Sequence, residues 1–257
     1  MLKNIKSIKS KNNQIMTTIS KLTTALIMSL LLVSCQFNGD FGFGVRGNGN
    51  VETVERSISD DFTEIKVSRG LDVYLTQSNQ VSLEVEADEN LHDVIITEVK
   101  NGVLNITTNE NISFSKSKKV MVSFKDIAKI TATSGSDVYS INTIVADNLE
   151  LTTTSGSDME LDIEVQVADC KSTSGSDLRV SGTTSKLFAS ATSGSDIKAG
   201  NLKAKISEAR ATSGADITLN TSDELYANAT SGADIKYYGN PEKVTKKDGV
   251  SGSVRKQ

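Results

Sequence analysis

Apolar and polar residues alternate along residues 131–236, in phase with a five-residue motif that occurs six times. Counted from the central glycine of each copy, the positions five before, three before and three after are mostly apolar, as in Leu151, Met159 and Ile197. The threonine two before and the aspartate two after are polar in every copy. A period of two is typical of a strand with one buried face, whereas a helix would need apolar residues at i, i+3 and i+4.

The motif is TSGSD in four copies and TSGAD in the last two, beginning at Thr133, Thr154, Thr173, Thr192, Thr212 and Thr230. Successive copies are 21, 19, 19, 20 and 18 residues apart. Self-similarity at this period indicates stacked units that cannot bury an apolar face alone. We therefore predict an all-β protein, a parallel β-helix (solenoid) with coils of about 20 residues.

Each motif is expected to form a corner of one coil. Its glycine supplies a backbone shape that a Cβ would obstruct. The turn glycines are Gly135, Gly156, Gly175, Gly194, Gly214 and Gly232. The serine or alanine that follows suits a bend over a narrow interior, and the aspartate is expected to accept hydrogen bonds from turn amides.

The segments on either side of the repeats are less regular. Residues 51–130 alternate in FTEIKVS, VSLEVEA and KVMVSF, which predicts a β-rich N-terminal part of the same domain. GLDVY at 70–74 echoes GSDVY at 135–139, so the repeat is expected to begin earlier in degenerate form. Residues 237–257 contain the single proline, Pro241, and many charges, which predicts a cap that blunts the open strand edge and favours a monomer.

Residues 1–34 have the parts of a secretory signal peptide: lysines, then an apolar run over 22–33, then LVSC ending at Cys35. The run is shorter than the roughly 20 residues that span a bilayer. Small residues before a cysteine are typical of a bacterial lipobox, in which signal peptidase II cuts before the cysteine and its sulfur carries diacylglycerol. We predict lipidation of Cys35 and a membrane anchor through it. An ordinary signal or a buried cysteine is the alternative.

Two further features concern the same end of the chain. Met16 is an alternative start, because the sequence from Met16 to Cys35 is a complete signal by itself. Residues 35–50 are rich in glycine, which predicts a flexible tether.

Charge and cysteine content narrow the possible functions. The first 34 residues hold five lysines and no acid, so the 28 basic residues less these five face 32 acidic ones, a net charge of about −9. An acidic chain is a poor nucleic-acid binder. Cys170 has no partner once Cys35 is lipidated, which argues against a disulfide scaffold or a zinc site, and we place it in the core.

Three features together carry a family resemblance: the segment GNGNVETVERSISDDFTEIKVSRGLDVYL at 47–75, the tandem SGSD or SGAD motifs, and YYGNPEKV followed by SGSV. With them the chain resembles the auto-transporter adhesin head domain family, or head GIN domain, of lipoproteins from Bacteroidetes-type bacteria. The resemblance implies a β-helical domain, export and membrane anchoring. The expected location is the cell envelope, as an outer-membrane lipoprotein whose head faces either the periplasm or the outside.

Catalysis is the least favoured function. Coils of 18 to 21 residues leave little room for the long loops that form the clefts of polysaccharide-processing β-helix enzymes. The single histidine, His92, has no serine or cysteine nearby in sequence, so we interpret it as packed or solvated rather than as a general base. We assign no catalytic residue and no cofactor.

The favoured function is a non-catalytic adhesion or scaffold module with a protein or glycan partner that the sequence does not name. Self-assembly of open-ended coils is the alternative. Few aromatic residues occupy outward positions, with Phe188 and Tyr226 the clearest, which weakens sugar stacking as a mode of binding.

The six motif aspartates are expected to stack about 4.8 Å apart, where adjacent carboxylates repel by about 1 to 4 kcal/mol. They are Asp137, Asp158, Asp177, Asp196, Asp216 and Asp234. Calcium would offset this repulsion, which makes them weak metal candidates. We favour hydrogen bonds from turn amides, with Arg179, Lys198 and Lys236 as countercharges.

Overall fold

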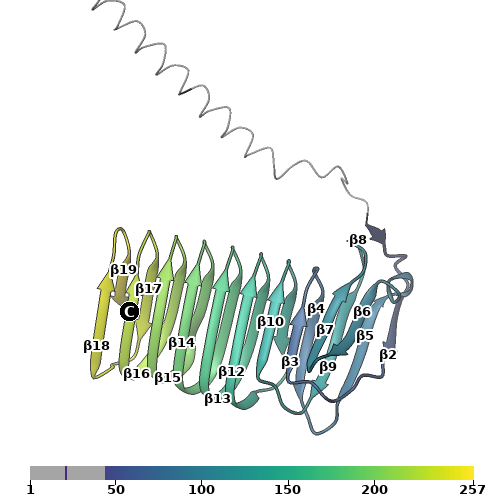
Figure 1. Cartoon of the computed structure of the whole chain (residues 1–257), viewed down its shortest axis with the longest axis horizontal. Coiled ribbons are helices and arrows are strands. Elements are labelled where there is room, and N and C mark those ends of the chain that lie inside the picture. The colour runs from purple at the N-terminus through teal and green to yellow at the C-terminus, as the bar shows by residue number, and fades with distance from the viewer. Residues whose placement is uncertain (1–20, 22–43) are drawn as a thin grey trace, which may run out of the picture. The chain divides into compact units, whose positions relative to one another are not determined.

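The repeats fold into stacked strands that pair in parallel, each coil in register with the next. The computed structural model describes Lys21 and residues 44–257, so the rest of the predicted signal peptide, Cys35 and residues 36–43 lie outside the described residues. The repeat strands follow one another in Figure 1 as β10 (Lys129–Thr133), β11 (Asp137–Ser140), β12 (Ile144–Thr154), β13 (Asp158–Thr173), β14 (Asp177–Thr192), β15 (Asp196–Thr212), β16 (Asp216–Ala229) and β17 (Asp234–Tyr238). The predicted all-β parallel β-helix is confirmed.

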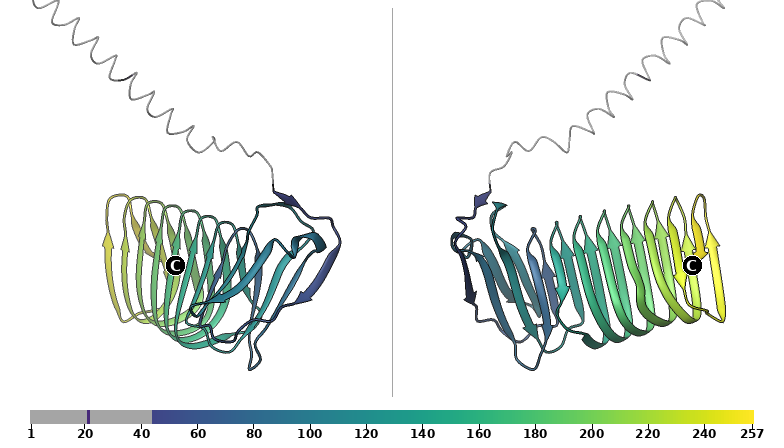
Figure 2. Two further views of the ribbon diagram at one scale, coloured as in Figure 1. Left: turned by 45° about the vertical axis from the view of Figure 1, so that its right-hand side comes forward. Right: turned by 180° about the vertical axis from the view of Figure 1, so that it is seen from behind.

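Each coil has two faces because strands such as β13 bend in the middle. Inward residues alternate from Met159 to Val165, and the alternation restarts at Ala168. The motif turn closes the coil on one side and a rounder bend closes it on the other, as Figures 1 and 2 show. We call the face that begins with the motif aspartates the aspartate face.

The inward columns form a continuous apolar core. Cys170 lies between Leu151 and Ala189 in one of these columns and is fully buried, as predicted. Burial raises the pKa of its thiol to about 12, so the thiolate is not formed near neutral pH. Because the thiolate is the reactive form of cysteine, Cys170 acts here as a small hydrophobic residue.

The motif turns place two successive residues in the left-handed region. In the first copy Ser134 has φ 57° and Gly135 has φ 68°, and the other five copies repeat these signs. Positive φ at both central residues defines a type I′ turn. A Cβ on Gly135 would meet nothing within 4 Å, so glycine is favoured here by the backbone angle and not by lack of space.

The second serine of TSGSD stabilises the turn by hydrogen bonds to the backbone. Ser176 is fully buried, and its Oγ accepts a hydrogen bond from the amide of Thr173 at 3.2 Å and donates to the Thr173 carbonyl at 2.8 Å. The sequence interpretation ascribed this serine only to a narrow interior. Ala215 and Ala233 occupy the same position in the last two copies, so the hydroxyl adds to the turn without being essential to it.

The solenoid begins well before the first motif, as the echo between 70–74 and 135–139 predicted. Strands β3 (Glu64–Val67) and β4 (Asp72–Gln77) pair in parallel with β10 and β11. The turn between β3 and β4 again has positive φ, at Arg69 and Gly70. The regular stack therefore includes part of the segment assigned to an irregular N-terminal half.

The remaining N-terminal strands add one more parallel strand to each face, and antiparallel strands then cover the edges. β7 (Val103–Thr108) and β9 (Lys118–Phe124) pair in parallel with β3 and β4. Antiparallel strands follow at each edge, where β6 (Ile95–Lys100) pairs with β7, and β5 (Ser82–Asp88) pairs with β9 and with β2 (Val51–Glu55). A short 3₁₀ helix, Glu89–Leu91, follows β5.

The prediction of a flexible tether over 35–50 is wrong for residues 44–50, because these residues pair with and hydrogen-bond to the folded domain. β1 (Val45–Arg46) pairs with β8 (Ile112–Phe114), and the buried carboxylate of Asp88 accepts hydrogen bonds from the amides of Gly49, Lys116 and Ser117 at 2.8 to 3.0 Å. Burial alone would raise the pKa of Asp88, but these amides outweigh it and hold the pKa below its usual range. The glycines here permit close contact: a Cβ on Gly47 would lie 2.1 Å from the Asp88 carboxylate.

Residues 237–257 extend the stack at its other end. β18 (Lys243–Asp248) and β19 (Ser253–Lys256) pair in parallel with β16 and β17. Lys246 and Asp248 continue the inward columns of Ala227 and Ala229, so charged residues stand where the next apolar layer would be. The Lys246 Nζ lies 4.9 Å from the centre of the Tyr237 ring. Inward-pointing charge is a known means of preventing edge-to-edge pairing.

We expect the double substitution Lys246→Leu and Asp248→Leu to cause end-to-end association, because it continues the apolar columns to the open edge. Lys247→Leu is the matched control, since Lys247 follows the outward column of Asn228 on the same strand. Sedimentation velocity would compare the two. A double variant that stays monomeric at every concentration would contradict the capping role.

Candidate functional site

The motif aspartates form one continuous column on the aspartate face. Register pairs each aspartate with the next and adds a seventh, Asp72, beside Asp137. The column lies between Lys119 of β9 and Ser253 of β19. Sequence reasoning found six members and missed Asp72, although the GLDVY segment contained the signal.

Most turn amides do not donate to these carboxylates, contrary to the expectation from sequence. They donate instead to carbonyls of neighbouring coils, as when the Gly175 amide donates to Ser193 O at 3.2 Å and the Asp177 amide to Ser157 O at 3.1 Å. Stacking itself therefore satisfies the turn backbone. The aspartate side chains are therefore left to pair with neighbouring side chains or to face solvent.

Countercharge is concentrated in the middle of the column. Asp177 accepts hydrogen bonds from Arg179 at 3.0 Å and from Lys198 at 2.7 Å, and Lys198 is also 3.4 Å from Asp196. Lys236 forms no ion pair within residues 44–257. Two of the three expected countercharges are thus in place.

Two aspartates in the N-terminal part of the column have raised pKa values. Partial burial raises the pKa of Asp72, and lysines 118 and 119 only partly offset this. Burial, then the charges of Asp72 and Asp158, raise the pKa of Asp137. Beside these carboxylates, Tyr74 and Tyr139 stack with ring centres 5.4 Å apart.

The Tyr74–Tyr139 pair is a feature that sequence reasoning missed. The two tyrosines occupy the same position in GLDVY and GSDVY, so the echo contained the signal. Phe188 and Tyr226, which were named as outward aromatics, lie on the opposite face under lysines, with Lys186 Nζ 4.4 Å from the Phe188 ring centre and Lys247 Nζ 5.7 Å from that of Tyr226.

We expect Asp137→Asn and Asp177→Asn to change stability in opposite directions at pH 7. The raised pKa of Asp137 means that its charge opposes folding above that pKa, so removing the charge should raise the urea midpoint. This gain should disappear as the pH falls through the carboxyl range, because the wild-type aspartate is then protonated in both states. Asp177→Asn should cost about 0.5 to 1 kcal/mol, since it weakens the contacts with Arg179 and Lys198. Midpoints that move the same way at pH 7 would contradict this description of the column.

Within the described residues, no group of three or more His, Cys, Asp or Glu side chains is placed to hold a metal ion. We expect millimolar calcium, added to chelator-treated protein, to leave the melting temperature unchanged. A rise of several degrees that disappears in the double variant Asp177→Asn and Asp196→Asn would make the column a calcium site.

His92 lies at the N-terminal end of the domain, away from the repeat column in sequence. Its carbonyl accepts a hydrogen bond from Arg56 at 2.6 Å, and its two ring nitrogens are buried without a hydrogen-bond partner in the described chain. A general base needs a partner within hydrogen-bond reach, so this geometry does not favour such a role.

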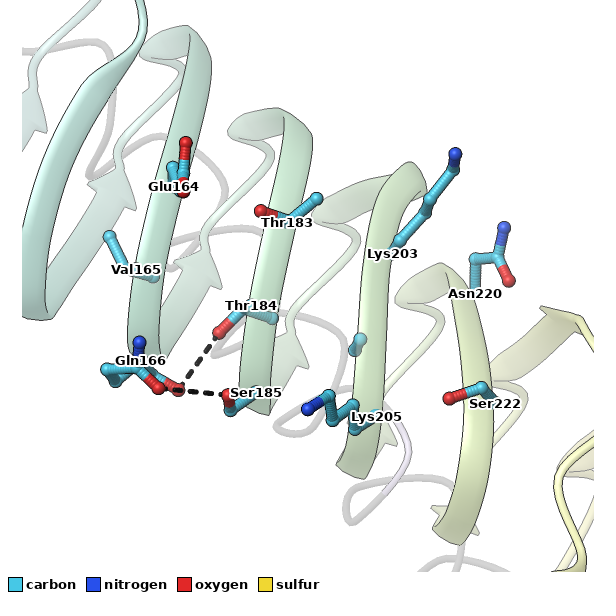
Figure 3. A pocket seen from close by; sticks show the side chains of 11 residues that line it. Glu164, Val165, Gln166, Thr183, Thr184, Ser185, Lys203, Lys205, Asn220 and Ser222 are labelled. Atoms are coloured by element: carbon cyan, nitrogen blue, oxygen red, sulfur yellow. Dashed lines mark hydrogen bonds between the residues drawn. The ribbon is translucent and has the colours of Figure 1, made fainter.

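A shallow groove of about 540 Å³ crosses β13, β14, β15 and β16 near the rounder bends (Figure 3). Its floor contains the buried side chains of Val165, Thr184 and Ala204. Ser185 donates to the Gln166 side chain at 3.0 Å across one wall. The other polar lining residues are Glu164, Thr183, Lys203, Lys205, Asn220 and Ser222.

The groove arises from coils of unequal length. Ala199 pairs with Leu219, but Lys203 pairs with Asn220, so β15 makes a bulge that β16 does not follow. Gly200 lies in this bulge, where a Cβ would be 3.3 Å from Thr218 and 3.4 Å from Tyr238. The sequence signal is the motif spacing, which is 20 residues for this coil and 18 for the next.

The fold and its open polar faces define a class of protein: a β-solenoid head that presents repeated surfaces. The sequence profile of the family described as "Putative auto-transporter adhesin, head GIN domain" matches residues 61–241. The chain belongs to this family, as the resemblance predicted. Comparison with curated proteins gives no match. Among the described residues no helix is long and apolar enough to cross a membrane.

Solved structures of several bacterial proteins have the same fold. A "putative adhesin" from Bacteroides fragilis aligns with a TM-score of 0.77 and 22% identity, over 83% of this chain and 100% of that one. A "putative lipid binding protein" from Parabacteroides distasonis gives 0.69 and 24%, over 83% and 99%. A "putative adhesin" from Parabacteroides merdae gives 0.69 and 19%, over 83% and 98%. Neither the family description nor these names refers to an enzyme.

Proposed function

We propose that this protein is an exported lipoprotein, anchored through Cys35, whose solenoid is a non-catalytic adhesion module at the outer face of the cell envelope. The observation that carries the proposal is the aspartate face. There, aspartates from seven successive coils form one register-matched polar column, which offers an extended partner the same contact again and again.

Three further observations support this function. The description of the family names an adhesin. The groove is open and shallow, unlike the enclosed cleft that excludes water around a reaction. Charged inward residues of β18 disfavour end-to-end growth, so the module is expected to act as a monomer and not as a filament.

Cell attachment tests the proposal. Cells with the gene and cells from which it is deleted would be compared on immobilised glycans and extracellular matrix proteins. The deletion is expected to lower attachment to at least one surface, and the full chain should restore it. Equal attachment of the two strains on every surface would contradict an adhesion role.

A further inference from the structure

Lys203 and Lys205 differ from most basic residues on the solenoid because they have no countercharge. Many outward lysines and arginines on the coils are paired with carboxylates or lie over aromatic rings, including Lys129, Lys171, Arg179, Lys198, Arg210, Lys186 and Lys247. Lys66, Lys236 and Arg255 also have no ion pair in residues 44–257, but none of them lines this groove. In residues 44–257, neither Lys203 nor Lys205 forms an ion pair. Two uncompensated ammonium groups therefore stand in one groove of an acidic protein.

The groove surrounds these lysines with neutral hydrogen-bonding groups. Register places Thr183 and Asn220 on either side of Lys203 in the neighbouring coils. Ser185 and Ser222 lie in the same groove as Lys205, and Figure 3 shows their side chains at its surface. Hydroxyl and amide groups both donate and accept, so they match the hydroxyls of a carbohydrate.

The floor and the length of the groove further restrict the ligand. Val165 and Ala204 lie in the floor between the polar rows, where they are buried and expose only a small apolar area, so the polar rows would make most of the contact with a ligand. Four neighbouring strands span about 14 Å at a spacing of about 4.8 Å. The volume of about 540 Å³ lies within the range typical of small-ligand sites.

From these observations we propose that the groove binds a short segment of an acidic polysaccharide. Carboxylates of the ligand lie on Lys203 and Lys205, and its hydroxyls bond to Thr183, Ser185 and Ser222. Glu164 at the β13 end repels carboxylates, so the acidic groups lie on the β15 side. The inference deepens the proposed adhesion function and rests on it for the choice of an extended ligand.

Titration of the purified full chain in detergent tests the groove. Tetragalacturonate is the acidic probe, maltotetraose is the neutral probe of equal length, and inorganic phosphate is the bare anion. We expect the acidic tetrasaccharide to bind at least about tenfold more tightly than either of the others. The double variant Lys203→Ala and Lys205→Ala should lose at least about tenfold in affinity for it.

The matched control is Lys236→Ala with Arg255→Ala, which removes two positive charges from adjacent strands of the same face outside the groove. It should change the affinity by less than about twofold, because distant exposed charges are screened. An equal loss in both double variants, no saturable binding of tetragalacturonate, or phosphate binding as tight as that of the tetrasaccharide would each overturn the proposal. Because binding is measured on purified protein, loss of the adhesion phenotype and loss of this site are separate results.

Discussion

The variant Gly182→Ala is expected to lower the free energy of unfolding by about 3 kcal/mol or more. Gly182 has φ 107°, and a Cβ there would lie 2.0 Å from the carbonyl oxygen of Ile163 on the adjacent coil. That oxygen belongs to backbone held in the parallel ladder, so it cannot move aside as a flexible side chain would. The coils must separate locally, which breaks ladder hydrogen bonds and opens the core beside Leu202.

A turn glycine is the appropriate control for this effect. Gly194 also has positive φ, at 67°, but a Cβ there would meet nothing within 4 Å. Gly194→Ala should therefore cost only about 1 to 2 kcal/mol, the usual penalty for an L-residue in the left-handed region. Urea unfolding of both variants measures the difference. Equal midpoints for the two variants would contradict this explanation, because the loss of stability at Gly182 would then not come from the close approach of β13 and β14.

The substitution Cys35→Ala is expected to abolish membrane attachment almost completely. If signal peptidase II cuts before Cys35 and its sulfur receives diacylglycerol, no neighbouring residue can replace that thiol. The protein should then accumulate as an uncleaved or mis-cleaved precursor in the soluble fraction. Fractionation of cells grown with a clickable fatty acid would follow both attachment and lipid label.

The chain provides its own control in Cys170. This thiol is fully buried in the core, so Cys170→Ala should leave lipid labelling and membrane attachment unchanged even if it lowers stability. A Cys35→Ala protein that still carries the fatty acid would refute the lipobox interpretation.

The repeat architecture could be predicted because a parallel stack places equal positions of successive coils next to one another. Inward columns such as Val138, Met159 and Leu178 were visible as a period of two around each glycine. The same logic placed Cys170 in the core. In such a fold, the alternation of apolar residues within one coil also shows which residues pack together when the coils stack.

Other features depend on contacts between segments with no common pattern. Glycines of 44–50 suggest flexibility in a sequence, yet Gly47 permits close contact with the buried Asp88, and the amide of Gly49 donates to the same carboxylate. Gly182 stands in a strand without any turn motif, and its close contact with Ile163 exists only once the coils stack. The motif spacing shows the length difference between two coils, but it does not show that this difference brings Lys203 and Ser222 into one groove, which depends on where the extra residues bulge.

Antibody labelling of intact cells tests the central claim most directly. An antibody raised against residues 44–257 would be applied to intact cells, to cells treated with protease, and to cells with a permeabilised outer membrane. An adhesion module at the outer face should be labelled on intact cells, and protease treatment should remove that signal. Labelling that appears only after permeabilisation would place the solenoid in the periplasm and contradict the adhesion function.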